Sequence, residues 1–509
     1  MQAQTSTVEL TRAESTEWAN YLYDFSNTSN GQSLAQGKYF FVSSTETKSE
    51  LELSRQLVEK ELAAGIQAED SFSCRFPARS KFILRVFYNN AVLNMEKCIG
   101  YQNFRDHMHA DSISLIFADY NPRIPSSAFG HVFLKLNSTD SGKKNELLSL
   151  IVDYGADPTG HSLQGYFVGS ILGVTQGKFS SDEFHRKIRL YNESENRDLW
   201  EYHINFTPQE RDVLSDVLFE QGENYFDYFF FSKNCAFYIG ALLQATRPRL
   251  EIVDKMNYWV LPIDLVKILV AKNAIDQISY RPSLYTTVTR NFKRMSPTQR
   301  KHLIVLMKSS QLFYDANLSS KENIQVFDTL VDYYTFLDLH HSLSSEENEY
   351  FQKIIFQRSL FSPTPAAIPF EKTNEDMPHR FFSGSRLQIR SQSVRSYGEE
   401  SDTYLSLGYR PTLHHFDDPD GGLDESKNVE FLNFSLMSKL EPNSKPFLER
   451  FDLFNLAQFT PINIFNSISS SASISYIDSS LNDFDYFHGV EGKGALGYTY
   501  EKFQDSCPI

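Results

Sequence analysis

The spacing of apolar residues divides the chain into a helical beginning, a mixed centre and a strand-rich end. In residues 1–110 the apolar side chains recur every three or four positions, which is typical of helices that bury one face. One such stripe stops at Gly65 and consists of Leu51, Leu57, Val58 and Leu62. We therefore predict a mainly helical N-terminal domain at 1–110.

Short strand-like segments begin at residue 112 and alternate with helical ones. Runs rich in β-branched and aromatic residues predict strands at 112–117, 128–136, 148–155, 184–191 and 200–205. Residues 207–210 form a capping box that predicts the start of a helix, and 263–271 predict another helix. We expect a β-rich core with helices packed on it, an α+β domain at 111–289. Glycines between Gly165 and Gly177 predict a mobile flap over its site.

Two further patterns follow this domain. Residues 290–360 have amphipathic helical periodicity and a second capping box at Ser296, which predicts a helical insertion. Prolines mark a linker at 361–382. From 383 to 509 the period becomes two, which predicts an antiparallel β domain. The alternation also fits a sheet of the outer-membrane type, but the strands that we find are too few to close such a structure.

Composition and charge narrow the possible functions. The 509 residues carry a net charge of −15, and no basic stripe offsets it, which argues against nucleic-acid binding. No apolar run reaches the roughly 18 residues that a membrane-spanning helix needs. The first residues lack a hydrophobic signal region, so we expect either a cytosolic protein or a mature form from which the signal has been removed.

The four cysteines lie at positions 74, 98, 235 and 507. None forms a C-x-x-C pair and no His/Cys cluster has zinc spacing, so we expect no structural metal site, and no motif requires a cofactor. Cys74 and Cys98 flank one predicted helix, and they either form a disulfide in an oxidising compartment or remain two buried thiols. Cys507 has no obvious partner.

The candidate nucleophile follows an aromatic run that ends abruptly at Ser232-Lys-Asn-Cys235. Helical spacing begins after this run, and either Ser232 or Asn234 can cap the new helix. Cys235 then lies in the first turn, where unpaired N–H groups and the helix dipole favour a thiolate, and Lys233 adds a positive charge. The alternative is a buried cysteine that only packs beneath the aromatic run.

A nucleophilic cysteine needs a base, and His131 is our candidate among thirteen histidines. A strand histidine that faces the N-terminus of a cysteine-bearing helix has the dyad geometry of papain-like enzymes. Asp153 on the next strand is our choice to orient the imidazole, with Tyr154 or Asn121 as alternatives. Backbone N–H groups at the start of the Cys235 helix would stabilise an oxyanion. The structural alternatives are a histidine that only packs and an exposed strand aspartate.

Four short motifs together resemble the Lnb-type N-terminal periplasmic domain family. They are Ser127-Ala-Phe-Gly-His131, Asp153-Tyr-Gly155, Arg197-Asp-Leu-Trp-Glu-Tyr202 and Ser232-Lys-Asn-Cys235. Residues 74–79 look like the N-terminal domain found beside it in proteobacterial members, and residues 410–418 look like the companion C-terminal β domain. The chain departs from many relatives at Asp153, where they carry asparagine, and at Ala236, where serine or tyrosine is common.

The resemblance implies a permuted papain-like (NlpC/LRAT-like) core in which the histidine precedes the cysteine. It also implies export to the periplasm, which suits a Cys74–Cys98 disulfide. The namesake activity is N-acylation of lipoproteins, in which a cysteine takes an acyl chain from phospholipid and passes it to an α-amine. Carried onto this chain, it makes Cys235 the acyl acceptor and His131 the base. The substrate-binding candidates around this pair are Asn121, Ser127, Tyr154 and Asn234.

Three functions remain open at this point. The first is a thiol acyltransferase or lipid-acyl hydrolase that acts on phospholipid and a lipoprotein or peptide, with contact to a membrane surface. The second is an NlpC-like cysteine peptidase or amidase that cleaves cell-wall peptides. The third is a non-enzymatic envelope scaffold whose C-terminal sheet binds a partner. In each case we expect a periplasmic or outer-membrane-associated protein.

Overall fold

A computed structural model shows that the chain forms two compact units. The first contains residues 1–118, 131–188 and 200–280, and the second contains 119–130, 189–199 and 281–509. No described helix is long and apolar enough to cross a membrane. The structure describes residues 9–25, 32–42, 46–124, 127–140, 143–144, 147, 149–157, 169–222, 224–256, 258–309, 311–361, 377–381, 384–394, 402–418, 426–460, 464–465, 467–478 and 488–499.

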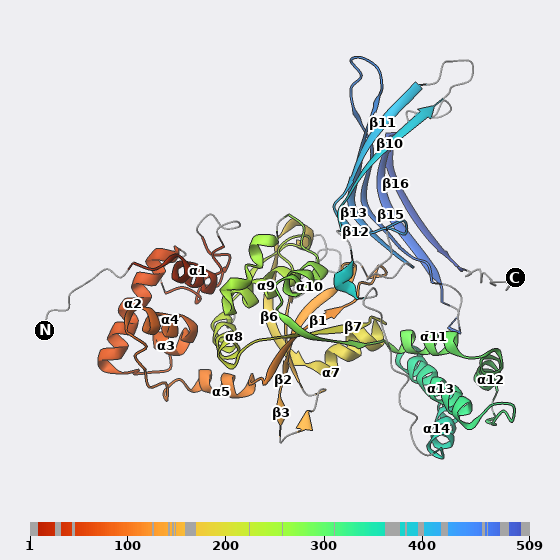
Figure 1. Ribbon diagram of the computed structural model, residues 1–509, viewed down its shortest axis with the longest axis horizontal. Coiled ribbons are helices and arrows are strands. Elements are labelled where there is room, and N and C mark those ends of the chain that lie inside the picture. Colours follow the sequence, from red (N-terminus) through yellow and green to blue (C-terminus); the bar gives the residue numbers. More distant parts are fainter. Residues whose placement is uncertain are drawn as a thin grey trace. The chain divides into compact units, whose positions relative to one another are not determined.

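Helices open the first unit, as the apolar spacing predicts (Figure 1). They are α1 (Arg12–Tyr21), α2 (Thr47–Ala64), α3 (Phe72–Arg75), α4 (Pro77–Phe87) and α5 (Ile99–His107). Thr11 and Glu14 start α1 with a capping box. The buried ring of Trp18 in α1 lies 5.4 Å from the ring of Phe82 in α4, so the two helices share one aromatic core.

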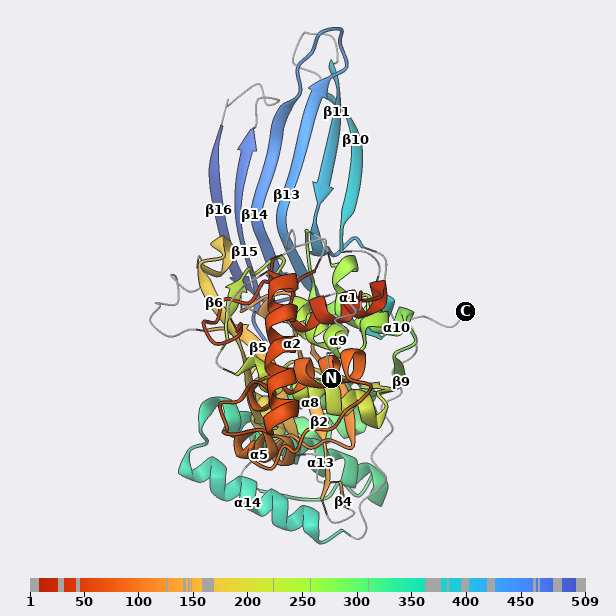
Figure 2. The same ribbon diagram turned by 90° about the vertical axis from the view of Figure 1, so that its left-hand side faces the viewer.

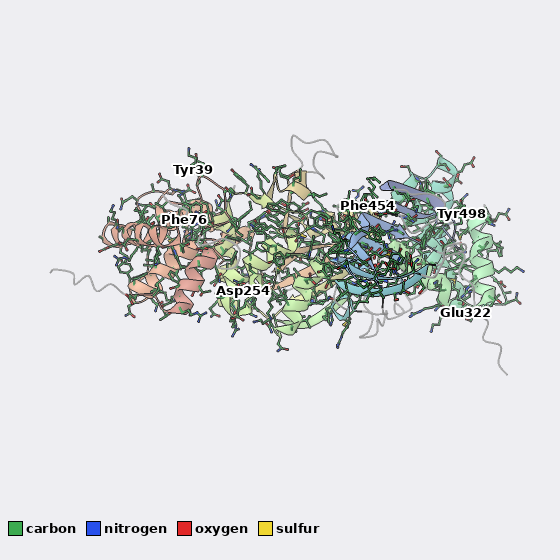
Figure 3. The ribbon with its side chains drawn as sticks, turned by 90° about the horizontal axis from the view of Figure 1, so that it is seen from above. Tyr39, Phe76, Asp254, Glu322, Phe454 and Tyr498 are labelled. Atoms are coloured by element: carbon green, nitrogen blue, oxygen red, sulfur yellow. A yellow bond between two sulfur atoms is a disulfide. The ribbon has the colours of Figure 1, made fainter. Side chains whose placement is uncertain are left out.

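A buried arginine ties these helices to a distant part of the unit. Arg79 in α4 is fully buried, and its guanidinium lies over the rings of Phe40 and Phe76, the latter labelled in Figure 3. Its Nε donates to Oε2 of Glu220 at 2.8 Å, and its Nη1 donates to Oε1 of Glu50 at 3.3 Å. Because Glu220 is 141 positions away, this ion pair joins segments that are remote in sequence.

Cys74 and Cys98 form a disulfide, which decides between the two alternatives left open by the sequence. The disulfide is buried in a small cluster with Ile66 and Tyr101. Cys74 lies in α3 and Cys98, 24 positions later, immediately precedes α5, so the bond holds these two helices together.

Replacing both disulfide cysteines with serine should lower the free energy of unfolding by about 3 kcal/mol, because the closed loop no longer restricts the unfolded chain. The melting temperature of the oxidised protein should then fall by roughly 10 °C, measured by circular dichroism with and without reductant. Reductant should lower the melting temperature of the wild type and leave that of the double variant unchanged. Equal melting temperatures for the oxidised wild type and the variant would contradict the prediction.

A seven-stranded sheet forms the core of the first unit, in the order β8-β6-β5-β2-β1-β7-β9. Its strands are β1 (Ser112–Ala118), β2 (His131–Asn137), β5 (Leu150–Ala156), β6 (Thr175–Glu183), β7 (Leu199–Ile204), β8 (Phe226–Tyr228) and β9 (Ile275–Arg281). The central strands β1, β2 and β5 are buried over most of their length, which explains their nearly continuous apolar runs. A short ladder of β3 (Thr139–Asp140) and β4 (Lys143–Lys144) follows β2.

Two predictions for this unit are wrong. Residues 184–191 are not a strand but form α7 (Phe184–Lys187) and the start of a π-helix, η3 (Ile188–Ser194). The flap expected at 165–177 is also incorrect where it is described, because residues 175–177 belong to β6 and pair with β5 and β8. The part of that segment at 165–168 lies outside the described residues.

Helices cover this sheet and carry the candidate cysteine. They are α8 (Pro208–Gln221), α9 (Cys235–Thr246) and α10 (Pro262–Ala271), with short 3-10 turns η4 (Pro248–Leu250) and η5 (Val253–Lys255). Thr207 and Glu210 form both halves of the predicted capping box at α8. Helix α9 is buried over its whole length between α8, α10 and the strands β2 and β5. The α+β class is therefore confirmed, and the permuted papain-like topology stays a prediction.

The second unit contains a helical group and a separate sheet. The helices are α11 (Leu284–Arg294), α12 (Pro297–Lys308), α13 (Ser320–His341) and α14 (Ser345–Ser359). Capping boxes start three of them, at Ser296, Ser319 and Ser344. Their shared core includes Leu303, Leu306, Phe327, Leu330 and Ile354. Of the linker predicted at 361–382, residues 362–376 and 382 lie outside the described residues, and Pro378–Arg380 form a 3-10 turn, η7.

The C-terminal sheet is an antiparallel meander in the order β10-β11-β13-β14-β15-β16, with β12 beside β13. Figure 2 shows its long strands lying side by side. The strands are β10 (Arg386–Val394), β11 (Asp402–Arg410), β12 (Thr412–His414), β13 (Lys427–Lys439), β14 (Phe447–Gln458), β15 (Ser469–Asp478) and β16 (His488–Gly497). The period-two pattern predicts these strands except β12 and β16. Cys507 lies outside the described residues.

Candidate active site

Cys235 is the first residue of α9, and it is the only free cysteine that the structure describes. The preceding Asn234 caps the helix, because its Oδ1 accepts the N–H groups of Ala236 and Phe237 at 3.0 and 3.4 Å. The Nδ2 of Asn234 donates to two carbonyl oxygens, those of Phe230 and Val260. The side chain of Asn234 is therefore fully engaged in fixing the start of the Cys235 helix.

This cap changes the expected oxyanion site. The sequence predicts that several N–H groups at the start of α9 would be free, but Asn234 already binds those of Ala236 and Phe237. Within the described part of the chain, the N–H of Cys235 itself has no hydrogen-bond acceptor. The N–H of Cys235 therefore remains as a donor for the oxyanion that forms on the carbonyl oxygen when the sulfur attacks.

The strand register brings His131 and Asp153 together. His131 begins β2, and Asp153 lies in β5, which pairs with β2 through Leu134 and Val152. Continuing this register places Asp153 opposite the residue two positions after His131, on the same face of the sheet. The Nε2 of His131 lies 2.7 Å from Oδ1 of Asp153, so the predicted histidine–aspartate contact is present.

His131 also contacts the cysteine. The Cys235 side chain lies close enough to act on the imidazole, both through its charge and through a hydrogen bond, while Nε2 is bound to Asp153. Burial disfavours the imidazolium, but the charges of Asp153 and Cys235 and the hydrogen bonds to both outweigh it and raise the pKa of His131 to about 10. With this raised pKa the imidazole is protonated at neutral pH.

Lys187 is a site residue that the sequence analysis missed. It ends α7, and its Nζ lies 2.5 Å from Oδ2 of Asp153, the carboxylate oxygen that His131 does not use. Burial raises the pKa of Asp153, but His131 and Lys187 together hold it well below its usual range. Asp153 is therefore a charged carboxylate between two cations. The spacing of the buried residues Phe184, Ile188 and Tyr191 is the helical signal that could have revealed this arrangement.

The remaining candidates have other surroundings. Tyr154 is buried among aromatic rings, with its ring 4.5 Å from that of Tyr238 in α9, and its hydroxyl has no partner among the described residues. Asn121 and Ser127 belong to the second unit, where both contact Glu195. Their substrate-binding roles stay predictions. No group of three or more His, Cys, Asp or Glu side chains in the described ranges is placed to hold a metal ion.

Comparison with protein families identifies the segment that contains this geometry. Residues 100–272 match the model of the Lnb N-terminal periplasmic domain. The chain carries an Lnb N-terminal domain. The match includes His131, Asp153 and Cys235, together with Lys187. A second family model, a domain of unknown function designated DUF7840, matches residues 385–507. Searches of curated proteins and of solved structures returned no match.

The Lnb N-terminal domain also indicates where the protein works. Its family is described as periplasmic, which indicates a periplasmic location for this chain. A buried Cys74–Cys98 disulfide agrees with that location, because the periplasm is oxidising and disulfides persist there.

Proposed function

We propose that the protein is a thiol-dependent acyltransferase or lipid-acyl hydrolase with Cys235 as its nucleophile. The observation that supports this best is the position of His131, which contacts both Cys235 and Asp153. A cysteine at a helix N-terminus beside an imidazolium is the arrangement that favours a nucleophilic thiolate. Asp153 binds the imidazole and Lys187 in turn binds Asp153. The family resemblance suggests phospholipid as the acyl donor.

In the acylation step, the thiolate of Cys235 attacks the carbonyl carbon of a phospholipid ester. The resulting oxyanion would accept a hydrogen bond from the N–H of Cys235. When the C–O bond breaks, the imidazolium of His131 gives its proton to the departing alcohol, which leaves as a lysophospholipid. The products are a thioester on Cys235 and a neutral imidazole still bound to Asp153.

In the second step, a neutral α-amine or a water molecule attacks the thioester. His131, now neutral, takes the proton from this nucleophile, and the C–S bond breaks to restore the thiolate and the imidazolium. An amine on a lipoprotein gives an N-acyl product, and water gives a free fatty acid. His131 is thus the acid of the first step and the base of the second.

Mass spectrometry of the intact protein tests this proposal. After incubation with phosphatidylethanolamine in micelles, the wild type should gain the mass of one acyl chain on the peptide that contains Cys235. Neutral hydroxylamine should remove it, because a thioester is labile to this reagent, and Cys235→Ala should gain nothing. An unmodified wild type that also releases no lysophospholipid, or an equal adduct on Cys235→Ala, would contradict the proposal.

A scaffold without enzymatic activity is the second candidate, and one observation favours it. Cys235 is only 4% exposed, as is common for cysteines with a purely structural role. A second experiment uses peptidoglycan fragments as substrate. Cleavage by the wild type that is lost in Cys235→Ala would assign Cys235 and His131 to a peptidase or amidase instead. A Cys235 that neither lipid nor peptide modifies would favour the scaffold.

A further inference from the structure

The C-terminal sheet has two chemically different faces. Alternate residues of a strand point to opposite faces, and paired residues on neighbouring strands share a face. The register joins one residue from each of six strands into a continuous row across the sheet. This row consists of Leu387, Tyr409, Phe434, Phe451, Tyr476 and Val490.

A second row lies beside the first on the same face. It is aliphatic and consists of Ile389, Leu407, Leu436 and Leu448. We call the two rows together the apolar belt, and none of its residues is acidic or basic. Several of its side chains are open to solvent, with exposed fractions of 66% for Leu387, 69% for Ile389 and 72% for Val490. Such an exposed apolar surface is unusual for a protein that has no partner at that surface.

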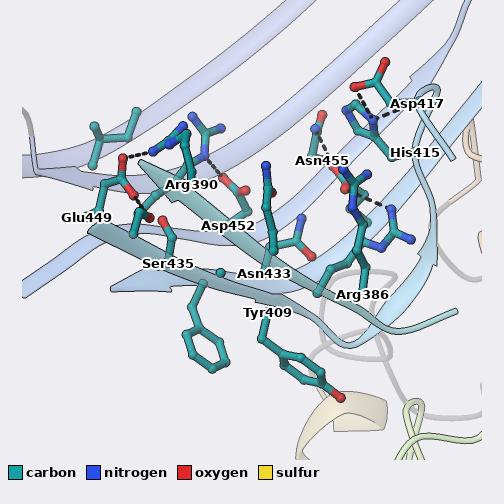
Figure 4. A pocket seen from close by; sticks show the side chains of 18 of the residues that line it. Arg386, Arg390, Tyr409, His415, Asp417, Asn433, Ser435, Glu449, Asp452 and Asn455 are labelled. Carbon is teal, nitrogen blue, oxygen red and sulfur yellow. Dashed lines mark hydrogen bonds and ion pairs between the residues drawn. The ribbon is translucent and has the colours of Figure 1, made fainter. Parts of the chain in front are cut away.

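The opposite face carries the charges, and they are paired with one another. Arg450 bonds to Asp452 at 2.7 Å, Arg390 bonds to Glu449, and Asn455 donates to Glu430 at 3.0 Å (Figure 4). These residues line a cavity of about 580 Å³.

Figure 4 also shows the side chain of Tyr409, a member of the apolar belt, pointing to the other side of the sheet. Charged residues of the polar face thus pair with one another, while the apolar belt lies on the other face. This is the reverse of an antiparallel sheet in water, which buries its apolar face.

At one end, the apolar face of the sheet is covered by an aromatic side chain. Phe431 on β13 is buried, and its ring lies 4.9 Å from the ring of Phe129 in the same unit. The belt begins three residues further along β13, at Phe434, which is 40% exposed. Both rings lie on one face because Leu432, with a positive φ of 56°, interrupts the alternation, so that Glu430 and Asn433 both line the cavity of the other face. The apolar belt therefore continues a surface that, at Phe431, is already packed against another apolar side chain.

We propose that the apolar belt docks on the hydrocarbon boundary of a phospholipid bilayer. A continuous surface without charges is complementary to hydrocarbon, whereas non-obligate interfaces between proteins are about as polar as the rest of the surface. Aromatic side chains such as Tyr409 and Tyr476 favour that boundary. The inference does not depend on the chemistry of Cys235.

Vesicle flotation with the full chain tests this inference. The wild type should float with vesicles of phosphatidylethanolamine and phosphatidylglycerol, and the double variant Leu387→Glu/Ile389→Glu should lose at least tenfold in partitioning. Both positions are largely exposed, so the variant retains its fold. Gln388→Glu/Gln392→Glu is the matched control, because it places two charges on the opposite face of the same strand. This control should float like the wild type.

Three results would overturn the inference. The first is a wild type that does not float, and the second is an apolar-belt variant that floats as well as its control. The third is a dimer in sedimentation velocity without lipid that Leu387→Glu/Ile389→Glu dissociates, because a second copy of the chain would then be the partner. Neither result depends on acylation of Cys235, so this inference and the proposed function can fail separately.

Discussion

Replacing His131 with alanine should slow the alkylation of Cys235 at pH 6 by about 10- to 100-fold. An isolated thiol ionises near pH 8.5, so only about 0.3% of it is thiolate at pH 6. In the wild type, Asp153 and Cys235 raise the pKa of His131 to about 10, and the imidazolium therefore persists beside the sulfur at pH 6. The measurement is the rate of modification by iodoacetamide, followed by mass spectrometry across pH.

The pH dependence has a defined direction. Because the pKa of His131 is raised, its activating charge is present at low pH and is lost as the pH rises through about 10. The two proteins should therefore differ most at pH 6 and least near pH 9, where an isolated thiol is mostly ionised. His203→Ala is a matched control, since His203 is also a strand histidine near a carboxylate, that of Glu201 at 3.8 Å. Equal rates for the wild type and His131→Ala at pH 6 would favour the scaffold.

Replacing Arg79 with leucine should lower the free energy of unfolding by about 3–5 kcal/mol, the largest change in stability that we expect. The substitution leaves the carboxylates of Glu50 and Glu220 buried without their cation. Burial raises the pKa of Glu220, and Arg79 opposes this effect. Without Arg79 the charged form of the Glu220 carboxylate would therefore be even less favourable. Thermal unfolding should show a melting temperature that is lower by roughly 10 °C.

Arg85→Leu is the control for this change. Arg85 lies in the same helix and pairs with Glu17 at 2.7 Å, but 47% of its side chain is exposed. Such a pair contributes about 1 kcal/mol or less, so the melting temperature should change by only a few degrees. A loss for Arg79→Leu that is no larger than that for Arg85→Leu would show that the buried pair does not hold the helices together.

Local signals predicted most of the helices correctly. The capping boxes at Thr207 and Ser296 form as expected, because a side-chain cap and its partner three residues later are both visible in the sequence. The contacts of His131 with Cys235 and Asp153 were also predicted, from a strand and a helix start. Asn234 shows the limit of such signals: its role as a cap was predicted, but the two N–H groups that it removes from the oxyanion site were not.

The segment at 184–191 shows why Lys187 was missed. Its apolar residues include Ile188 and Leu190, two positions apart, and this spacing suggested a strand. Leu190 is in fact 44% exposed, whereas Phe184, Ile188 and Tyr191 are buried at helical spacing. The sequence of this segment fits both the strand period of two and the helical period. Burial against the rest of the protein decided for the helix. Strand β16 was missed for another reason, because its glycines leave few apolar side chains to alternate.

The two cations of the site occupy unusual places along the chain. The segment 131–188 belongs to the first unit. His131 is its first residue, and Lys187 is the residue before its last. They contact different oxygens of the Asp153 carboxylate. Asp153 therefore joins the two ends of the segment 131–188 at a single carboxylate, and a substitution of this one residue would release both ends at once.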